Sequence, residues 1–352
     1  MNALGLRIAK LIETQGPLSV AQFMTMALLD PTAGFYATRN PFGATGDFVT
    51  APDISQIFGE LIGLWCVQNW LDQEKPARAQ LVELGPGRGT LMADALRAAK
   101  LAPEFLECIE VVMVEASPVL RAQQEERLKD CGARITWKER FEESDRPLFL
   151  IANEFFDALP VRQFVQTERG WCERMVVVDE GGLAFALSPV ASAVAVEGDA
   201  PQGGVYEISP ATLALAEEIG HRIARQGGAA LIIDYGYDAP GFGETLQAVG
   251  GHQFKELLEA PGEIDLSAHV DFTSLAAAAR RGGAQTFGPV GQGAFLQMVG
   301  IKPRAESLMR ANKSEAPEIT QAVDRLVNPE QMGTLFKALA IVPPRVPTPP
   351  GF

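Results

Sequence analysis

A glycine-rich run, Gly85-Pro86-Gly87-Arg88-Gly89, follows an apolar stretch at residues 81–84 and precedes a segment with helical spacing at 90–100. Glycine lacks a Cβ atom, so its backbone can turn tightly and approach a ligand closely. The helix behind the turn offers free N–H groups. Many turns contain two or three glycines, so the pattern alone predicts a ligand site at Gly85, Gly87 and Gly89 without identifying the ligand.

Glu83 comes directly before this turn. In a dinucleotide-binding fold a pyrophosphate lies over the turn, and a carboxylate there would repel it. S-adenosylmethionine (SAM) carries no phosphate. It carries a sulfonium and an ammonium group, which a carboxylate attracts. Glu83 therefore favours SAM over a nicotinamide or flavin dinucleotide, which stays the alternative.

Polar side chains also follow two other predicted strands. Glu115 ends the strand at 110–114, where an acidic residue can hold the hydroxyls of a ribose; a solvated strand end is the alternative. Asn153 and Glu154 follow the strand at 148–152. In an open parallel sheet, ligands bind where the strand order reverses, so these two residues are expected beside the glycine turn. The alternative is an ordinary loop in which Asp157 caps a turn.

His269 and Asp271 are two positions apart in a polar, glycine-rich segment. An aspartate beside a histidine raises the basicity of the imidazole, and the pair would then act as a general base. The alternative is equally simple: Asp271 is the N-cap of a helix at 273–281, and His269 is structural.

Alternating helix and strand patterns must position these residues, and they predict an α/β fold. Helices are expected at 4–13, 19–29, 55–70, 118–129 and 209–226, and within 293–325. Buried strands are expected at 81–84, 110–114, 134–137, 148–152, 229–234, 284–287 and 336–342. Residues 162–178 read as a hairpin with its turn at 168–170, and 183–187 as a third strand. The long loop at 32–52 is rich in glycine and aromatic residues, which argues for a functional loop.

Composition narrows the class of protein. The 352 residues carry a formal net charge of −14, so a nucleic-acid partner is not expected. An acidic surface favours a basic substrate or partner, and the alternative is that the charge only keeps the protein soluble. Four scattered cysteines lack CxxC spacing, and three histidines form no HExxH motif, so no metal site is predicted. No apolar run reaches the length of a membrane span and no signal-peptide pattern is present, so we expect a cytoplasmic protein.

Several motifs together resemble one family, the MidA-like SAM-dependent methyltransferases, which are bacterial relatives of a mitochondrial complex I assembly factor. The resemblance covers about residues 10 to 345. It rests on Gly46-Asp47-Phe48-Val49-Thr50-Ala51-Pro52 with Phe58-Gly59-Glu60, Glu83-Leu84-Gly85-Pro86-Gly87-Arg88-Gly89, Asn153-Glu154-Phe155-Phe156-Asp157-Ala158-Leu159-Pro160, Ile233-Asp234-Tyr235-Gly236 and His269-Val270-Asp271-Phe272. One departure is Asp53, where this family is expected to have glutamate.

The resemblance implies a class I SAM-methyltransferase fold, with a Rossmann-like sheet of seven strands, an N-terminal helical addition and an inserted substrate region. We therefore expect an N-terminal helical lid at 1–75 and a core at 76–160 and 205–345. An inserted hairpin region is expected at 161–204 and a helical insertion at 301–333. The oligomeric state is not predicted.

The resemblance also implies methylation of arginine in a protein, linked to assembly of NADH:ubiquinone oxidoreductase (complex I), with a subunit of that complex as an expected acceptor. A guanidinium is a poor nucleophile, so carboxylates must orient it and stabilise its charge. The implied catalytic residues are Glu154, Asp157, His269 and Asp271. The implied SAM-binding residues are Gly46, Phe48, Thr50, Glu83, Gly85, Gly87, Gly89, Glu115 and Asn153. A SAM-binding assembly chaperone without catalysis and a dinucleotide-dependent oxidoreductase are the alternatives.

Overall fold

The computed structural model describes residues 1–38, 49–194, 196, 198–239, 241–251 and 253–352. The chain forms two compact units. Unit 1 comprises Met1–Pro41, Asp157–Thr212 and Ala239–His269, and unit 2 comprises Phe42–Phe156, Leu213–Asp238 and Val270–Phe352. Each unit is thus assembled from separate stretches of the sequence. The segmentation into lid, core and insertions stays a prediction.

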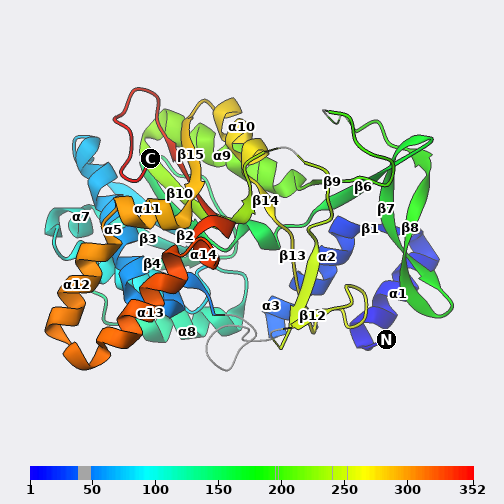
Figure 1. Ribbon diagram of the computed structural model, residues 1–352, viewed down its shortest axis with the longest axis horizontal. Helices are drawn as coiled ribbons and strands as arrows, with labels where there is room; N and C mark the ends of the chain where they lie inside the picture. The colour runs from blue at the N-terminus through cyan, green and yellow to red at the C-terminus, as the bar shows by residue number, and fades with distance from the viewer. Residues whose placement is uncertain (39–48, 195, 197, 240, 252) are drawn as a thin grey trace. The chain divides into compact units, whose positions relative to one another are not determined.

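Unit 2 contains the large sheet, whose strands follow the order β15-β16-β10-β5-β2-β3-β4 (Figure 1). These seven strands are the seven predicted from the sequence. A two-residue strand, β14, also pairs with β10. The bounds are β2 Ala79–Leu84, β3 Ile109–Val114, β4 Ile135–Lys138, β5 Leu148–Asn153, β10 Gly228–Tyr237, β14 Val270–Asp271, β15 Gln285–Gly291 and β16 Phe336–Val342.

The strand order reverses between β2 and β5, as predicted. These two strands pair in parallel, with Leu81 opposite Phe149 and Leu84 opposite Ala152. Strand β3 continues on the far side of β2, and β10 lies on the far side of β5. The carboxyl ends of β2 and β5 therefore lie side by side, which is where such sheets bind ligands.

Both faces of this sheet are covered by helices. Alternate residues of each strand point to opposite faces, and both sets are buried. Leu231 and Ile233 join the cluster formed with α5 and α6, whereas the intervening Ile232 is just as buried but lies outside that cluster. The helices are α4 Ala51–Ile54, α5 Gln56–Asp72, α6 Thr90–Ala99, α7 Pro103–Cys108, α8 Pro118–Leu128, α9 Pro210–Gln226, α10 Phe272–Arg281, α11 Gln292–Met298, α12 Ile301–Ala311, α13 Ala316–Val327 and α14 Met332–Leu335.

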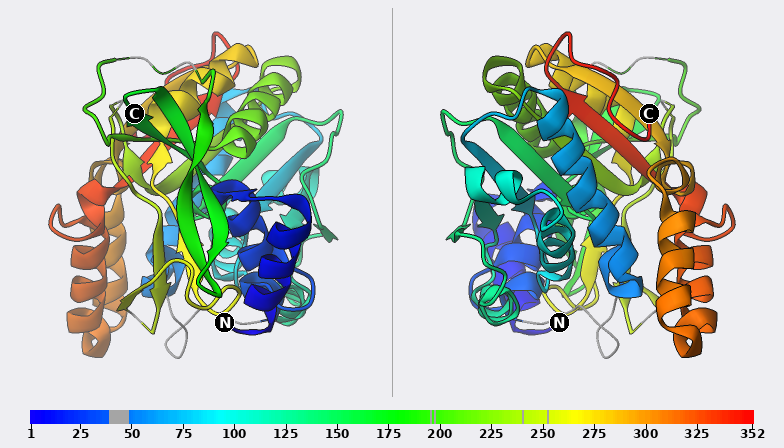
Figure 2. Two further views of the ribbon diagram at one scale, coloured as in Figure 1. Left: turned by 90° about the vertical axis from the view of Figure 1, so that its right-hand side faces the viewer. Right: turned by 90° about the vertical axis from the view of Figure 1, so that its left-hand side faces the viewer.

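Unit 1 is built around a second sheet, in the order β1-β7-β6-β9 with β8 on the other edge of β7. The predicted hairpin is confirmed: β6 ends at Thr167 and β7 begins at Gly170. Helices α1 and α2 lie against this twisted sheet (Figure 2). The bounds are α1 Ala3–Gln15, β1 Leu18–Ser19, α2 Val20–Leu29, α3 Phe35–Thr38, β6 Arg162–Thr167, β7 Gly170–Asp179, β8 Gly182–Ala191, β9 Val205–Ile208, β11 Gln247–Gly250, β12 Gln253–Lys255 and β13 Asp265–Ser267.

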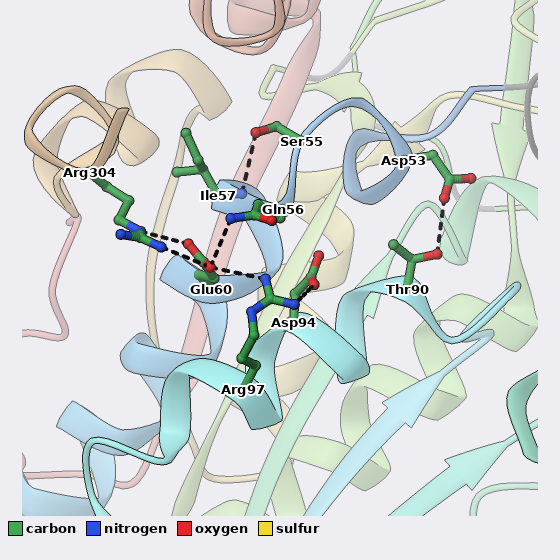
Figure 3. A network of polar contacts seen from close by, with 9 residues as sticks. All are labelled: Asp53, Ser55, Gln56, Ile57, Glu60, Thr90, Asp94, Arg97 and Arg304. Atoms are coloured by element: carbon green, nitrogen blue, oxygen red, sulfur yellow. Dashed lines mark hydrogen bonds and ion pairs between the residues drawn. The ribbon is translucent and has the colours of Figure 1, made fainter. Parts of the chain in front are cut away.

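In unit 2, α12 and α13 lie side by side as a helical pair (Figures 1 and 2). Arg304 of α12 donates to both carboxylate oxygens of Glu60 on α5, at 2.7 and 3.1 Å. Arg97 of α6 donates to the same carboxylate at 2.9 Å (Figure 3). A single buried carboxylate thus joins three helices.

None of the helices in the described part of the chain is long and apolar enough to span a membrane.

Candidate active site

A pocket opens at the carboxyl ends of β2 and β5, inside unit 2. Its lining comes from the start of α4, the glycine turn, the first turn of α6 and the end of β5. The lining residues are Thr50, Pro52, Asp53, Glu83, Gly85, Pro86, Gly87, Arg88, Thr90, Leu91, Asn153 and Glu154. Five predicted cofactor residues (Thr50, Glu83, Gly85, Gly87 and Asn153) and the predicted catalytic Glu154 thus meet around one pocket.

The glycine turn has the backbone conformation that the sequence predicted. Gly85, Gly87 and Gly89 all have positive φ angles, of 60°, 52° and 75°, a region that other residues rarely adopt. A β-carbon on Gly85 would also lie 2.7 Å from the ring of Phe155. Gly89 is the N-cap of α6, so the turn leads directly into the free N–H groups of a helix.

Glu83 is almost fully buried, with 3% of its surface exposed. Burial, followed by the charge of Glu115, raises the pKa of its carboxyl to about 8. Within the described residues its Oε2 has no hydrogen-bond partner. A buried carboxylate that faces a pocket without a partner matches a cationic ligand group, as the ammonium of SAM is.

Glu115 lies close enough to Glu83 to affect its pKa. The Glu115 carboxylate accepts from the backbone N–H of Ser117 at 2.7 Å and from Nε2 of Gln124 at 3.1 Å. Burial still raises the pKa of Glu115 above its usual value, although these hydrogen bonds oppose the shift. The predicted ribose-binding role of Glu115 stays a prediction.

Gln124, which no sequence argument identified, is fully buried beside this carboxylate. Its Nε2 also donates to the carbonyl of Gly87 at 2.7 Å, and its Oε1 accepts from the indole of Trp137 at 3.0 Å. One amide therefore joins α8, the glycine turn and β4. Its position in a helix with charged neighbours gave no signal of this role.

Glu154 adopts a left-handed backbone conformation with φ of 51°, which costs energy in a residue other than glycine. Its Oε1 accepts from the N–H of Ala51 and from Nδ2 of Asn153, both at 3.0 Å. The carboxylate is therefore fixed at the pocket, and it also holds the start of α4. Its catalytic role stays a prediction.

Asp234, at the end of β10, holds this turn in place and is fully buried. Its Oδ2 accepts from the N–H groups of Phe155 at 3.1 Å and Phe156 at 2.9 Å, and its Oδ1 accepts from Tyr235 N–H at 2.9 Å. Asp234 belongs to a motif that carried the family resemblance, but its supporting role could not be read from the sequence.

Asp271 is the N-cap of α10, as the alternative interpretation held. Its carboxylate accepts from the N–H of Ser274 at 3.0 Å and from the Ser274 hydroxyl at 2.6 Å. Burial lowers the pKa of His269, and the charge of Glu207 opposes this shift. That Asp271 raises the basicity of His269 stays a prediction. A catalytic role for either residue stays a prediction.

His269 is held by a polar cluster in unit 1. Its backbone N–H donates to the hydroxyl of Thr245 at 2.9 Å. That hydroxyl donates in turn to the carboxylate of Glu207, a buried residue of β9. Gln163 on β6 donates to the same carboxylate at 2.7 Å. Glu207 thus fixes the segment that carries His269, and no pattern in the sequence indicated this role.

The remaining predicted residues are placed as follows. Asp157 is half-buried in the short 3-10 helix Phe156–Ala158 and belongs, like His269, to unit 1. Gly46 and Phe48 lie outside the described residues. Asp53, noted above as a departure from the family, lines the pocket and accepts from the hydroxyl of Thr90 at 3.0 Å (Figure 3).

Residues 61–290 match the model of a family described as S-adenosyl-L-methionine-dependent methyltransferase. The chain is 38% identical to the protein arginine methyltransferase NDUFAF7, mitochondrial, of Danio rerio, over 95% of this chain and 85% of that protein. It is 36% identical to the protein of the same name from Homo sapiens, over 94% of this chain and 81% of that protein.

Among solved structures, the fold is similar to that of a Burkholderia thailandensis protein crystallised with S-adenosyl-homocysteine. The TM-score is 0.87 at 28% sequence identity, over 99% of this chain and 94% of the other. The glycine turn, the buried Glu83 and the strand order agree with a SAM site, and the dinucleotide alternative is set aside. The chain belongs to this family of SAM-dependent methyltransferases.

Proposed function

We propose that this protein transfers a methyl group from SAM to an arginine side chain of another protein. The observation that carries the proposal is the position of Glu154, whose carboxylate is fixed by Ala51 and Asn153 at the pocket that contains Glu83. The name of the curated relatives, protein arginine methyltransferase, supports the choice of acceptor.

When bound, SAM supplies an electrophilic methyl group on a sulfonium. Glu83 would hold the ammonium group of SAM and Glu115 its ribose. The glycine turn would approach the part of SAM between these two groups. Glu154 would orient one guanidinium nitrogen and stabilise the charge that stays on the guanidinium. His269 is the proposed acceptor of the released proton. Its lowered pKa favours the neutral imidazole that can accept one.

The charge of unit 1 supports a basic acceptor. Its three sequence segments contain 15 acidic and 7 basic residues. An excess of negative charge attracts a cationic partner and repels a polyanion. We further propose, from the family resemblance, that the acceptor is a subunit of NADH:ubiquinone oxidoreductase.

The expected cytoplasmic location also remains a proposal. All four cysteines are free thiols, and Cys66 and Cys172 are buried. Free thiols are the usual state in a reducing compartment, and this state supports the proposal.

The test is a transfer assay with tritiated-methyl SAM and purified subunits of NADH:ubiquinone oxidoreductase, followed by mass spectrometry of their arginines. We expect label on arginine, and Glu154→Gln should reduce the turnover rate about a hundredfold or more while SAM still binds. Full turnover in Glu154→Gln with normal SAM affinity would show that its assigned role is wrong. Binding of SAM and a subunit without transfer would instead establish the assembly chaperone.

A further inference from the structure

Strand β8 is an edge strand of the sheet in unit 1 (Figure 1). It pairs with β7 on one side, and no other strand in the described part of the chain pairs with it. An edge strand presents a row of unpaired backbone N–H and C=O groups, which proteins usually protect with charged residues or proline. The stretch Leu183-Ala184-Phe185-Ala186-Leu187 contains neither. The edge of β8 can therefore accept another strand.

The register with β7 identifies the backbone groups that face outwards. Asp179 pairs with Gly182 across a two-residue turn whose residues both have positive φ angles, of 45° and 78°. The pair beside such a turn is hydrogen-bonded, and the pairs along an antiparallel ladder then alternate between hydrogen-bonded and not. The backbone groups that point away from β7 are therefore those of Leu183, Phe185 and Leu187.

A groove of about 450 Å³ runs along this edge, inside unit 1. Four consecutive residues of the strand, Gly182 to Phe185, line it. Successive side chains of a strand point to opposite faces, so a groove lined by consecutive residues follows the edge of the sheet rather than one face. The rest of the lining comes from Met1 and from the segment after β12, Glu256-Leu257-Leu258-Glu259.

The side chains that line the groove give it a negative charge. Glu256 and Glu259 are the only lining residues with charged side chains, and both are exposed. Arg174 of β7 packs over the ring of Phe185 at 5.4 Å, but its charge is already paired with Glu244. The groove therefore attracts a basic segment and disfavours an acidic one.

The same charge argues against a second copy of this chain as the occupant. Two copies joined edge to edge through β8 would share an isologous interface, so the carboxylates of Glu256 and Glu259 from both copies would lie along it. Like charges placed together in an interface repel each other. A partner that brings positive charge avoids this cost.

We propose that the edge of β8 is a docking site for an extended, basic segment of a partner protein, which adds to the sheet as a further strand. The stretch Leu183–Leu187 pairs with about five residues of such a segment. Apolar side chains of the segment would pack against Leu257 and Leu258, and arginine or lysine side chains would approach the two glutamates. This inference goes beyond methyl transfer, because it concerns unit 1 alone and requires no SAM.

The experiment measures the binding of synthetic peptides by fluorescence anisotropy. The probe is a fluorescein-labelled peptide of three Arg-Val repeats with blocked ends. A second peptide has three Glu-Val repeats. A third has the Arg-Val sequence but is N-methylated at two adjacent central residues, so that neither edge of the peptide can pair fully. We expect the N-methylated probe to bind about tenfold more weakly than the unmodified one. The Glu-Val peptide should not bind, and binding of the Arg-Val probe should weaken as the salt concentration rises.

Two pairs of variants locate the probe. Phe185→Pro removes an outward N–H and should bind the probe about threefold to tenfold more weakly than Phe185→Ala, which loses the same ring but keeps the N–H. Glu256→Gln with Glu259→Gln should weaken binding about tenfold. Glu13→Gln with Glu168→Gln removes the same charge from exposed positions of unit 1 outside the groove and should have little effect. Thermal unfolding shows whether each variant is folded, and the N-methylated peptide tests the pairing without any change in the protein.

Failure of the unaltered protein to bind the Arg-Val probe would overturn the inference, as would equal binding of the unmodified and N-methylated probes. Loss of affinity in Glu154→Gln, with none in the groove variants, would assign the probe to the pocket of unit 2 and also overturn it. Self-association in sedimentation that Phe185→Pro abolishes and Phe185→Ala does not would give the edge to a second copy of the chain, against the inference.

Discussion

Gln124 donates a 3.1 Å hydrogen bond from its side-chain amide to the carboxylate of Glu115. The same nitrogen donates to the carbonyl of Gly87, so the orientation of Glu115 is coupled to the glycine turn. We expect Gln124→Met to weaken SAM binding about tenfold, because the carboxylate loses its orienting partner and the Gly87 carbonyl loses its donor. Gln123→Met, the same change one residue earlier on a half-exposed side chain, should have little effect. Equal affinities of the two variants for SAM in calorimetry would contradict the coupling.

The turn after β5 depends on Asp234, which accepts from the N–H groups of Phe155 and Phe156. Asp234→Asn replaces one accepting oxygen with an amide that donates, so at least one buried N–H loses its partner. We expect a loss of about 2 kcal/mol in the free energy of unfolding by urea, together with weaker SAM binding. Asp238→Asn changes an exposed residue whose carboxylate pairs with Lys337 and is the matched control. If Asp234→Asn were as stable as this control, the turn after β5 would not depend on Asp234.

The ionisation of Glu60 should make the stability of the protein depend on pH. Burial tends to raise the pKa of its carboxyl, but hydrogen bonds from Arg304 and Arg97 outweigh burial and lower it. A lowered pKa in the folded state adds stability above the unfolded pKa, and this stability is lost as the pH falls through the folded value. We expect Glu60→Gln to be less stable than the unaltered protein at neutral pH, and the difference to shrink below about pH 4.5. A difference that does not change with pH in urea titrations would rule out this account.

The contact of Arg304 with Glu60 also ties α12 to α5. Arg304 is partly exposed, so solvent screens this pair and Arg304→Met should cost only about 1 kcal/mol of unfolding free energy. Hydrogen exchange should, however, quicken in α12 and α13 before it does in the sheet. Arg310→Met, a more exposed arginine of the same helix, is the control. Unchanged exchange in both helices would mean that apolar packing alone holds them.

SAM binding should strengthen as the pH rises towards the pKa of Glu83. Burial raises that pKa to about 8, so Glu83 is mostly protonated at neutral pH, whereas an ammonium beside it favours the ionised form. Binding then releases a proton, and the affinity should increase by up to about tenfold per pH unit between about pH 6 and about pH 7.5. Glu83→Gln should bind weakly with little pH dependence. An unaltered slope in that variant would assign the proton to another group.

The sequence predicted the sheet well because each core strand is a short apolar run whose neighbours are turn residues. Leu231 and Ile232, for example, are buried on opposite faces, a pattern that needs no knowledge of partners. Strand β9 was not predicted, because Val205–Ile208 contains the polar residues Tyr206 and Glu207 and forms a strand only by pairing with β6.

The sequence predicted about half of the residues that line the pocket, but not Asp53, Arg88 or Thr90. It also missed the buried residues that support the lining. Gln124, Asp234 and Glu207 are buried polar residues whose partners lie far away in the sequence, at Gly87, Phe155 and Gln163. Nothing local distinguishes such a residue from a solvated one. The sequence likewise left two interpretations of Asp271 open, and the structure identifies it as the N-cap of α10.

Strand β16 lies between β10 and β15 in the sheet, although it follows both in the sequence. During synthesis, β10 and β15 therefore leave the ribosome before the strand that separates them exists. Until Phe336–Val342 emerges, β10 presents an unpaired apolar edge, and such edges pair readily with the wrong partner. The newly made chain thus passes through an interval in which the sheet ends at β10, and chaperones that cover exposed strands would have their greatest effect at that edge.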